Sequence, residues 1–321
     1  MVAVKLLVTI DTEEDEWGAF NLARYSVSNI ERLTRLQELF DRFGVRPTYL
    51  VTQPVTEAGS AIEVLAPIRE RGGCEIGAHC HPWNTPPLVE ERTPRNSMLC
   101  NLPEDLQYQK LKHLKESIRA AYGVTPTSFR AGRWGFDASV ARNLARLEFR
   151  VDSSITPYLT WEAFEGPNFD REYPSEQYRM STDDIGLEDE RSRLVEIPTT
   201  TGFTGVVAGG GYPIHRAISR APLTWLRARG IGSRLGLFRT TWLCPEMTEV
   251  KEMIDLSDRV LARGGTILNL MFHSTTLTAG LTPFVRTGAD EVAFLGRIRA
   301  YLEYCRVRGI GSATLSESVS R

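Results

Sequence analysis

His79 and His81, with carboxylates nearby in the sequence, are the residue types that hold the metal ion of a hydrolytic enzyme. In an extended chain, side chains two residues apart point to the same side. Asp11 and Glu13 end another apolar run and can supply a carboxylate. Two histidines and one carboxylate bind Zn²⁺ or a similar divalent ion and leave positions open for water. Such an ion lowers the pKa of water to about 7, which creates a nucleophile.

Further polar residues also end apolar runs. Arg130 and Arg133 end one run and Asp152 ends the next. His273 ends a late run. In a parallel α/β protein, functional groups collect at the carboxyl ends of the strands. A second carboxylate can then act as a base, and a separate histidine can protonate a leaving group.

Strand and helix signals alternate along the chain, which predicts a mostly parallel sheet, either open or closed into a barrel. Apolar runs place strands near residues 2–10, 48–52, 74–78, 128–131, 149–153, 194–197, 266–271 and 309–313. Helical spacing places helices near residues 28–43, 60–71, 103–122, 137–147, 245–263 and 289–308. Ser28 and Glu31 have the spacing of a capping box, and Gly44 has the position of a C-terminal cap.

The chain shows neither a repeat nor a linker, so we expect one domain over residues 1–321. Within it, long loops are expected at about 157–193 and 202–241, where the regular pattern stops. The basic stretch 216–239 inside the second loop has two interpretations. It could be a solvated helix pair, or it could bind a phosphate, a nucleotide-sugar or the surface of a membrane.

Composition limits the class of protein. The chain has 321 residues, 42% hydrophobic and 24% charged, as in a soluble globular protein with a large core. Its 38 basic and 40 acidic residues nearly cancel, which argues against general nucleic-acid binding. Five scattered cysteines without a CxxC pair indicate reduced thiols. The sequence carries no recognisable signal peptide or membrane span, so we expect a cytoplasmic protein.

Some polar residues also have purely structural interpretations. The acidic run 13–16 could form a solvated face, and Arg130 could make an ordinary ion pair. His113 and His215 are better explained as structural residues. Cys80 lies between the two histidines, but its side chain should point to the opposite side and pack.

Taken together, these segments resemble the polysaccharide deacetylase family, the NodB-homology carbohydrate esterases. The similarity is closest to the intracellular branch that acts in lipopolysaccharide and surface-polysaccharide biosynthesis. It is carried by residues 10–14 (IDTEE), 75–84 (EIGAHCHPWN) and 269–274 (NLMFHS), with 129–135 and 151–154 between them in the expected order. The resemblance implies a distorted parallel barrel of the (β/α)7 type and a metal-dependent hydrolase that removes acetyl groups from carbohydrates.

The resemblance also implies roles for individual residues. Asp11 matches the general base, and Arg130 matches the arginine that orients this base. His79 matches the first metal histidine. His273 matches the acid that protonates the departing amine, and Asp152 falls in the segment whose aspartate supports that acid.

The sequence departs from the family pattern at several positions. The position after Asp11, often a second aspartate, is a threonine, so Glu13 becomes the expected metal ligand. Trp83 stands where the second metal histidine is usual, and His81 takes its place. The implied metal is Zn²⁺, with Co²⁺, Mn²⁺ or Ni²⁺ as alternatives. Arg133 replaces a common aromatic residue, which makes the substrate face more cationic.

The expected substrate is an N- or O-acetylated sugar or a precursor of a polysaccharide or lipopolysaccharide, contacted by Trp83, Arg133 and Trp134. Aromatic rings at a cleft often stack on sugars. Three alternatives remain open. They are another amidohydrolase acting on a formyl or ureide-type amide, a non-catalytic carbohydrate-binding relic, and a glycosidase using Asp11 and Asp152. The glycosidase would leave the two histidines without a role. The oligomeric state stays open.

Overall fold

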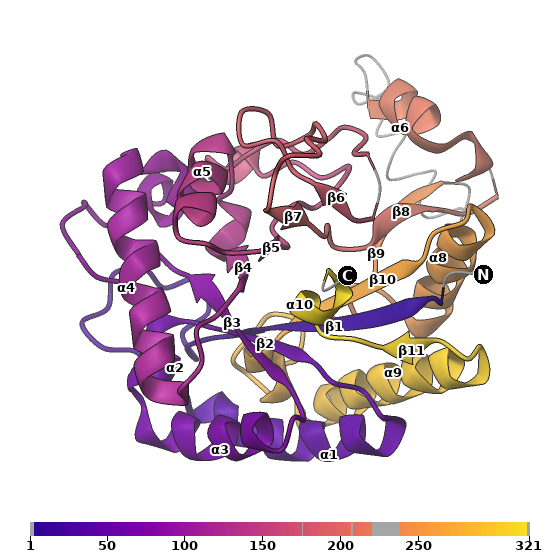
Figure 1. Ribbon diagram of the computed structural model, residues 1–321. Coiled ribbons are helices and arrows are strands. Elements are labelled where there is room, and N and C mark those ends of the chain that lie inside the picture. The colour runs from indigo at the N-terminus through magenta and orange to yellow at the C-terminus, as the bar shows by residue number, and fades with distance from the viewer. Residues whose placement is uncertain (1–2, 175, 207, 220–237, 320–321) are drawn as a thin grey trace.

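A curled, mostly parallel sheet forms the centre of the protein in the computed structural model, which describes residues 3–174, 176–206, 208–219 and 238–319 (Figure 1). In spatial order its strands are β10 (Ile267–His273), β1 (Lys5–Thr12), β2 (Thr48–Val51), β3 (Glu75–Cys80), β4 (Ser128–Ala131), β5 (Val151–Asp152), β7 (Val195–Glu196) and β6 (Tyr178–Arg179). All of these neighbours are parallel except β6 and β7. The predicted fold class, a distorted parallel barrel, is confirmed.

Two smaller pairings complete the strands. A short strand near the C-terminus, β11 (Gly311–Ser312), runs parallel to the start of β1. A separate antiparallel pair, β8 (Thr201–Thr204) with β9 (Arg239–Trp242), follows β7 along the chain.

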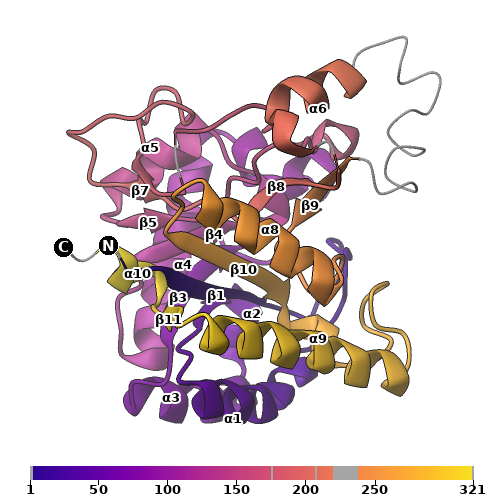
Figure 2. The same ribbon diagram turned by 90° about the vertical axis from the view of Figure 1, so that its right-hand side faces the viewer.

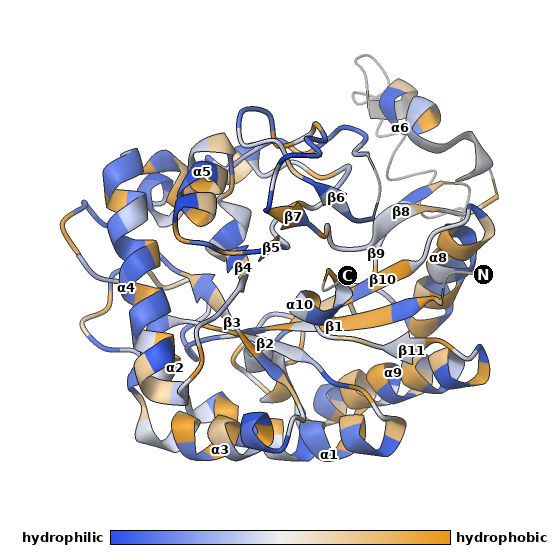
Figure 3. Ribbon diagram, viewed as in Figure 1, coloured by the Kyte–Doolittle hydropathy of each residue, from blue (hydrophilic) through white to orange (hydrophobic). Residues whose placement is uncertain are grey.

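Helices surround the curled sheet (Figure 2). They are α1 (Leu33–Phe43), α2 (Gln53–Glu57), α3 (Gly59–Glu70), α4 (Glu104–Tyr122), α5 (Ala138–Arg146), α8 (Val250–Ala262), α9 (Gly288–Val307) and the short α10 (Leu315–Ser318). Figure 3 shows β1 and β10 as largely hydrophobic strands, whereas the helices around them are mixed. This is the pattern of amphipathic helices that bury one face against a sheet.

Alternation along β1 divides the core in two. Leu6, Val8 and Ile10 pack in the large cluster shared with the helices. Leu7 faces the other way, into a small cluster with Leu50, Val151, Val195, Ile197, Ile267, Ala313 and Leu315. Two and four residues further on, Thr9 and Asp11 share the side of Leu7, because side chains alternate in a strand. The interior is therefore apolar at the amino ends of the strands and polar toward their carboxyl ends.

The sheet curls until β7 approaches β10, but the described residues form no strand ladder between these two. Hydrogen bonds around Asn269 cross this gap instead. The backbone N–H of Asn269 donates to Thr200 Oγ1 (2.8 Å), and its carbonyl oxygen accepts from Thr200 N (3.2 Å). Its side-chain amide donates to the carbonyl oxygens of Ile197 (3.3 Å) and Pro198 (3.2 Å). These contacts close the barrel.

The N-terminal end of the first helix differs from the prediction. Residues 28–32 form a 3-10 helix, η1 (Ser28–Arg32), without a side-chain cap from its own sequence, so the capping box of Ser28 and Glu31 is wrong. The carboxylate of Asp15, which precedes the helix in the chain, caps its N-terminal end instead. It accepts hydrogen bonds from N and Oγ of Ser28 (2.8 and 2.7 Å) and from N of Asn29 (2.9 Å). The predicted C-terminal cap at Gly44 is confirmed, with a left-handed φ of 65°.

The two expected loops contain more structure than their composition suggests. Residues 157–193 include η5 (Glu162–Phe164), the edge strand β6, and the buried side chains of Phe169 and Met180. Residues 202–241 contain most of β8 and β9 and the helix α6 (Gly211–Ser219). The basic stretch 216–239 lies largely outside the described residues. In the described part of the chain, every helix is too short or too polar to cross a bilayer.

Candidate active site

A buried ion pair between Asp11 and Arg130 spans the polar interior of the barrel. Arg130 has no exposed surface, and its Nη1 donates to Asp11 Oδ1 at 2.6 Å. Its Nη2 donates to Thr9 Oγ1 and Ser153 Oγ, and its Nε to the carbonyl oxygen of Ser153. Burial alone would raise the pKa of Asp11, but the Arg130 guanidinium and two nearby histidines lower it below its ordinary value. Asp11 is therefore an oriented carboxylate.

Glu13, His79 and His81 bring their donor atoms together beside this ion pair, as predicted for a metal site. His81 Nε2 lies 3.1 Å from His79 Nε2 and 3.3 Å from Glu13 Oε2. His79 Nε2 lies 3.7 Å from the same glutamate oxygen. The three donor atoms lie within 4.8 Å of one another, and all three residues are buried. His79 lies near the end of β3 and His81 directly follows the strand, so the i, i+2 spacing places both rings on one side.

The outer nitrogens of both rings have acceptors that determine the tautomers. His79 Nδ1 lies 3.1 Å from the carbonyl oxygen of Arg130, and His81 Nδ1 lies 2.7 Å from Glu14 Oε1. These oxygens accept hydrogen bonds, so each ring carries a proton on Nδ1. Burial lowers the pKa of His79, which keeps that ring neutral. With both Nδ1 atoms bound to acceptors, the two Nε2 atoms face Glu13, and this donor set fits a divalent ion.

The pKa of Glu13 reflects its burial among other carboxylates. Burial, with the carboxylates of Glu14 and Asp11, raises its pKa to about 7 against the lowering effect of nearby histidines. A positive ion among these donors would remove that penalty, because it stabilises the carboxylate.

Glu14 is a second buried carboxylate behind His81, and sequence reasoning missed it. Its Oε1 accepts from His81 Nδ1, from Trp83 Nε1 (3.2 Å) and from Asn84 Nδ2 (2.8 Å). Its Oε2 accepts from Thr52 Oγ1 at 3.1 Å. The interpretation of residues 13–16 as a solvated face is therefore wrong for the first three, which are buried. Glu14 holds the second histidine in place.

His273 ends β10 in register with Asp11 and is supported by Glu246. Its Nδ1 lies 3.0 Å from Glu246 Oε2, and its Nε2 lies 3.7 Å from Asp11 Oδ2. The same glutamate accepts from the backbone N–H of His273 (2.8 Å) and from Thr276 Oγ1 (2.6 Å). Burial alone would lower the pKa of His273, but Glu246, with the other carboxylates, raises it to about 10. His273 is therefore an imidazolium at neutral pH.

Asp152 does not support His273, so that part of the prediction is wrong. It is fully buried on β5, where its oxygens accept from Oγ (2.7 Å) and N (3.1 Å) of Ser154. Glu196 lies opposite it in register on β7 and is also fully buried. Burial raises the pKa of both carboxyls, and the charge of Asp152 raises that of Glu196 further. Two adjacent buried carboxyls resist ionising together because their charges would repel.

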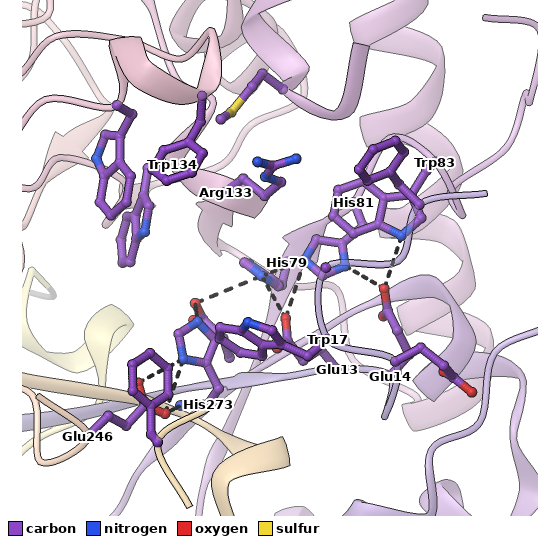
Figure 4. Close-up of a pocket in the computed structure, with 18 of the residues that line it drawn as sticks. Glu13, Glu14, Trp17, His79, His81, Trp83, Arg133, Trp134, Glu246 and His273 are labelled. Carbon is purple, nitrogen blue, oxygen red and sulfur yellow. Dashed lines mark hydrogen bonds and ion pairs between the residues drawn. The ribbon is translucent and has the colours of Figure 1, made fainter. Parts of the chain in front are cut away.

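A pocket of about 420 Å³ opens above these groups (Figure 4). Its walls are largely aromatic: Trp17, Phe20, Trp83, Trp134, Trp161, Phe164, Trp242 and Phe284. Trp83 stacks on His81 with ring centres 4.0 Å apart, and Trp17 meets His273 edge-on at 4.7 Å. Trp134 stacks on Trp161 at 5.9 Å. The three residues predicted to bind substrate, Trp83, Arg133 and Trp134, all line this pocket.

The turn after β4 has an unusual backbone. Arg133 (φ 52°) and Trp134 (φ 63°) are consecutive non-glycine residues in the left-handed region, at a cost of about 1–3 kcal/mol each. Gly132 precedes them, and a Cβ there would lie 2.3 Å from His81 Cδ2 and 2.6 Å from the carbonyl oxygen of Cys80. Only glycine allows the turn to lie this close to the second histidine.

No protein-family model matches the sequence, and neither does any curated protein. Solved structures do resemble it in fold. A protein described as a glycoside hydrolase/deacetylase from Parabacteroides distasonis is 14% identical, with a TM-score of 0.62 over 98% of this chain and 70% of the other. The 4-alpha-glucanotransferase from Thermococcus litoralis is 12% identical, with a TM-score of 0.57 over 100% of this chain and 41% of the other. A protein described as a polysaccharide deacetylase from Mycobacterium smegmatis is 18% identical, with a TM-score of 0.48 over 98% and 94%.

Proposed function

We propose that the protein is a metal-dependent carbohydrate deacetylase of the polysaccharide deacetylase family, which removes an N-acetyl or O-acetyl group from a sugar or glycan precursor. One observation carries this proposal. The metal donor set of Glu13, His79 and His81 shares one pocket with an anionic base, Asp11, and a cationic acid, His273. Metal-dependent hydrolysis of an amide uses a bound ion, a base and an acid in one place.

Glu13, His79 and His81 would hold the ion, and Zn²⁺ is the first choice for two imidazoles and a carboxylate. When bound, the ion would polarise the acyl carbonyl and increase the acidity of a water molecule. Co²⁺, Mn²⁺ and Ni²⁺ are alternatives, since affinity for such a donor set varies gradually among these metals.

The protein's own residues divide the proton transfers between them. Arg130 occupies Oδ1 of Asp11, which leaves Oδ2 to take a proton from the attacking water. Glu246 occupies Nδ1 of His273, so Nε2–H points toward Asp11 Oδ2 and the reacting group. His273 gives this proton to the amine nitrogen as the C–N bond breaks, and acetate leaves as the other product.

The substrate proposal rests on the pocket walls. Flat aromatic rings match the apolar faces of pyranose rings, and the pocket presents several of them beside the donor set. We place this reaction in lipopolysaccharide or surface-polysaccharide biosynthesis in the cytoplasm. The five unpaired cysteines are consistent with a reducing compartment.

Two alternatives are less well supported by the geometry. A glycosidase would need Asp11 and Asp152 on either side of a substrate, but Asp152 has no exposed surface and is paired with Glu196. A non-catalytic relic would not need an oriented base and a supported acid, yet Arg130 and Glu246 hold both in place. An amidohydrolase acting on formyl or ureide groups would use the same residues. Only its substrates distinguish it from a deacetylase.

The test is a substrate panel with and without metal. Purified protein is supplied with Zn²⁺, Co²⁺ or Mn²⁺ and offered N-acetylated sugars, O-acetylated sugars, formylated sugars and cyclic ureides. We expect metal-dependent release of acetate. Asp11→Asn should lower kcat by at least about 100-fold while metal content, measured by elemental analysis, is retained. Activity only on formyl or ureide substrates, or full activity of Asp11→Asn, would overturn the proposal.

A further inference from the structure

Arg133 is the only lysine or arginine among the pocket-lining residues that the structure describes, and five acidic residues surround the same space. The acids have partners within the protein. Glu14 and Glu246 hold His81 and His273, while Glu16 accepts from the backbone N–H of Ser26. The remaining two are Asp11, the proposed base, and Glu13, the proposed metal ligand. Among the basic side chains of the pocket, Arg133 alone has no carboxylate partner in the described part of the chain, whereas His79, His81 and His273 each have one.

The surroundings of Arg133 neutralise little of its charge. Its Nη1 donates to Ser97 Oγ at 2.6 Å, and its guanidinium carbon lies 5.9 Å from the ring centre of Phe20. Within the described ranges, no carboxylate forms an ion pair with it. The side chain is half-buried, and burial lowers its pKa. A guanidinium has five N–H donors in a planar fork, so most of them remain available to a ligand.

The backbone holds this side chain in the pocket by a strained turn. Left-handed conformations at two successive non-glycine residues, Arg133 and Trp134, are disfavoured and persist where the surrounding structure imposes them. Figure 4 shows Arg133 between Trp134 on one side and His81 with Trp83 on the other, above His79. The guanidinium therefore faces the same space as the metal donors, between two aromatic walls.

We propose that Arg133 binds an anionic group of the substrate, a carboxylate or a phosphate, and so selects acylated sugars that carry a negative charge. This inference rests on the proposed deacetylase function for the identity of the reaction, but the anion site stands on its own contacts. A pocket of about 420 Å³ lies toward the small end of ligand pockets, so the charge belongs to the acylated sugar or to its immediate substituent. Two oxygens of a carboxylate or of a phosphate can accept two parallel hydrogen bonds from the guanidinium fork.

Catalytic selectivity provides the first test. The kcat/KM for acetate release is compared among N-acetylglucosamine, its 6-phosphate and the matching N-acetylated uronic acid, using the metal-loaded protein. We expect at least a tenfold preference for one anionic sugar over the neutral one, and the two anionic substrates distinguish phosphate from carboxylate. Arg133→Gln should reduce this ratio to near one, mainly through KM. Arg133→Lys should keep part of it, because it keeps the charge but loses the fork.

A binding measurement provides the second test and separates the two proposals. The deacetylated products, glucosamine and glucosamine 6-phosphate, are titrated against the pocket tryptophans by fluorescence. We expect the wild type to bind glucosamine 6-phosphate at least tenfold more tightly than glucosamine. Arg133→Gln should bind the two products with equal affinity. Arg150→Gln is the matched control, since Arg150 is an exposed arginine next to the amino end of β5 and away from the pocket.

The outcomes are distinct. Equal kcat/KM for neutral and anionic sugars in the wild type, or an equal loss for both in Arg133→Gln, would refute the anion site. If none of the sugars is hydrolysed, the deacetylase proposal fails, and the binding ratio alone decides the role of Arg133. If Arg150→Gln reduces the preference for the phosphorylated product as much as Arg133→Gln does, the anion site is also refuted. The preference would then come from the net charge of the protein.

Discussion

The imidazole of His273 and the carboxylate of Glu246 lie 3.0 Å apart, which joins the end of β10 to the segment between β9 and α8. The same carboxylate also holds the backbone N–H of His273, so it fixes the position of the ring as well as its charge. Of the carboxylates that raise the pKa of this histidine to about 10, Glu246 has the largest effect. This pair replaces the predicted contact with Asp152.

We expect Glu246→Gln to lower the pKa of His273 toward its ordinary value, because the largest source of stabilisation for the imidazolium is removed. The acid must be protonated to act, so the basic limb of the kcat profile should move to lower pH. At pH 8 we expect a loss of roughly 10- to 100-fold in kcat. Glu249→Gln, an exposed change nearby, should leave the profile unchanged. An unmoved basic limb in Glu246→Gln would exclude Glu246 as the positioning residue.

Glu14 should control metal affinity without touching the metal. Its hydrogen bond to His81 Nδ1 orients the ring and increases the basicity of Nε2. We expect Glu14→Gln to weaken Zn²⁺ binding by about 10- to 100-fold, measured by competition with a chelator. Glu16→Gln removes a charge from the same acidic run, where the carboxylate accepts from Ser26, and should change the affinity little. Equal affinities for the wild type and Glu14→Gln would contradict this role.

Gly132 should tolerate no side chain. A Cβ at this position would lie 2.3 Å from His81 Cδ2, so Gly132→Ala must displace either the histidine or the turn. We expect weaker Zn²⁺ binding and a loss of about 1–3 kcal/mol in the free energy of unfolding. Gly296→Ala, inside α9 where nothing lies within 4 Å, should be neutral or stabilising. Wild-type metal affinity in Gly132→Ala would show that the close approach has no function.

The buried pair of Glu196 and Asp152 makes stability depend on pH. Burial, followed by the effect of Asp152, holds the pKa of Glu196 well above its unfolded value of about 4.3. The protonated form is favoured in the folded state, so its stabilisation is complete below that value and is lost as pH rises through the folded pKa.

Glu196→Gln mimics the protonated carboxyl at every pH. We expect it to increase the free energy of unfolding by roughly 1–3 kcal/mol at pH 8, with the difference shrinking toward pH 4. Urea denaturation at several pH values measures this difference. The exposed Glu91→Gln serves as the control. A constant difference across the pH range would show that Glu196 does not have a raised pKa in the folded protein.

The fold was predictable from the sequence because its strands are apolar runs with a polar residue at the end. For the same reason Asp11, His79, Arg130 and His273 could be placed together before the structure was known.

Contacts that depend on closure of the barrel were not predictable. Glu246 reaches His273 only because the segment after β9 passes beside β10, and no periodicity in the sequence signals this approach. Asp152 was assigned the wrong partner because the register of β5 with β7 places it opposite Glu196. Glu14 looked like part of a solvated acidic run, although its burial follows from the hydrogen bonds of His81 and Trp83.

Between β7 and β10, individual hydrogen bonds of Asn269 and Thr200 take the place that a strand ladder has between the other neighbouring strands of the described sheet. Asp11, His79 and Arg130 lie on the run of strands from β1 to β4, whereas His273 ends β10, the strand that carries Asn269 at this joint. Ser153 Oγ accepts hydrogen bonds from both Asn269 Nδ2 and Arg130 Nη2, and Arg130 in turn holds Asp11. The side chain that closes the barrel is therefore two hydrogen-bond partners away from the proposed base, so closure of the barrel and orientation of that base depend on one network.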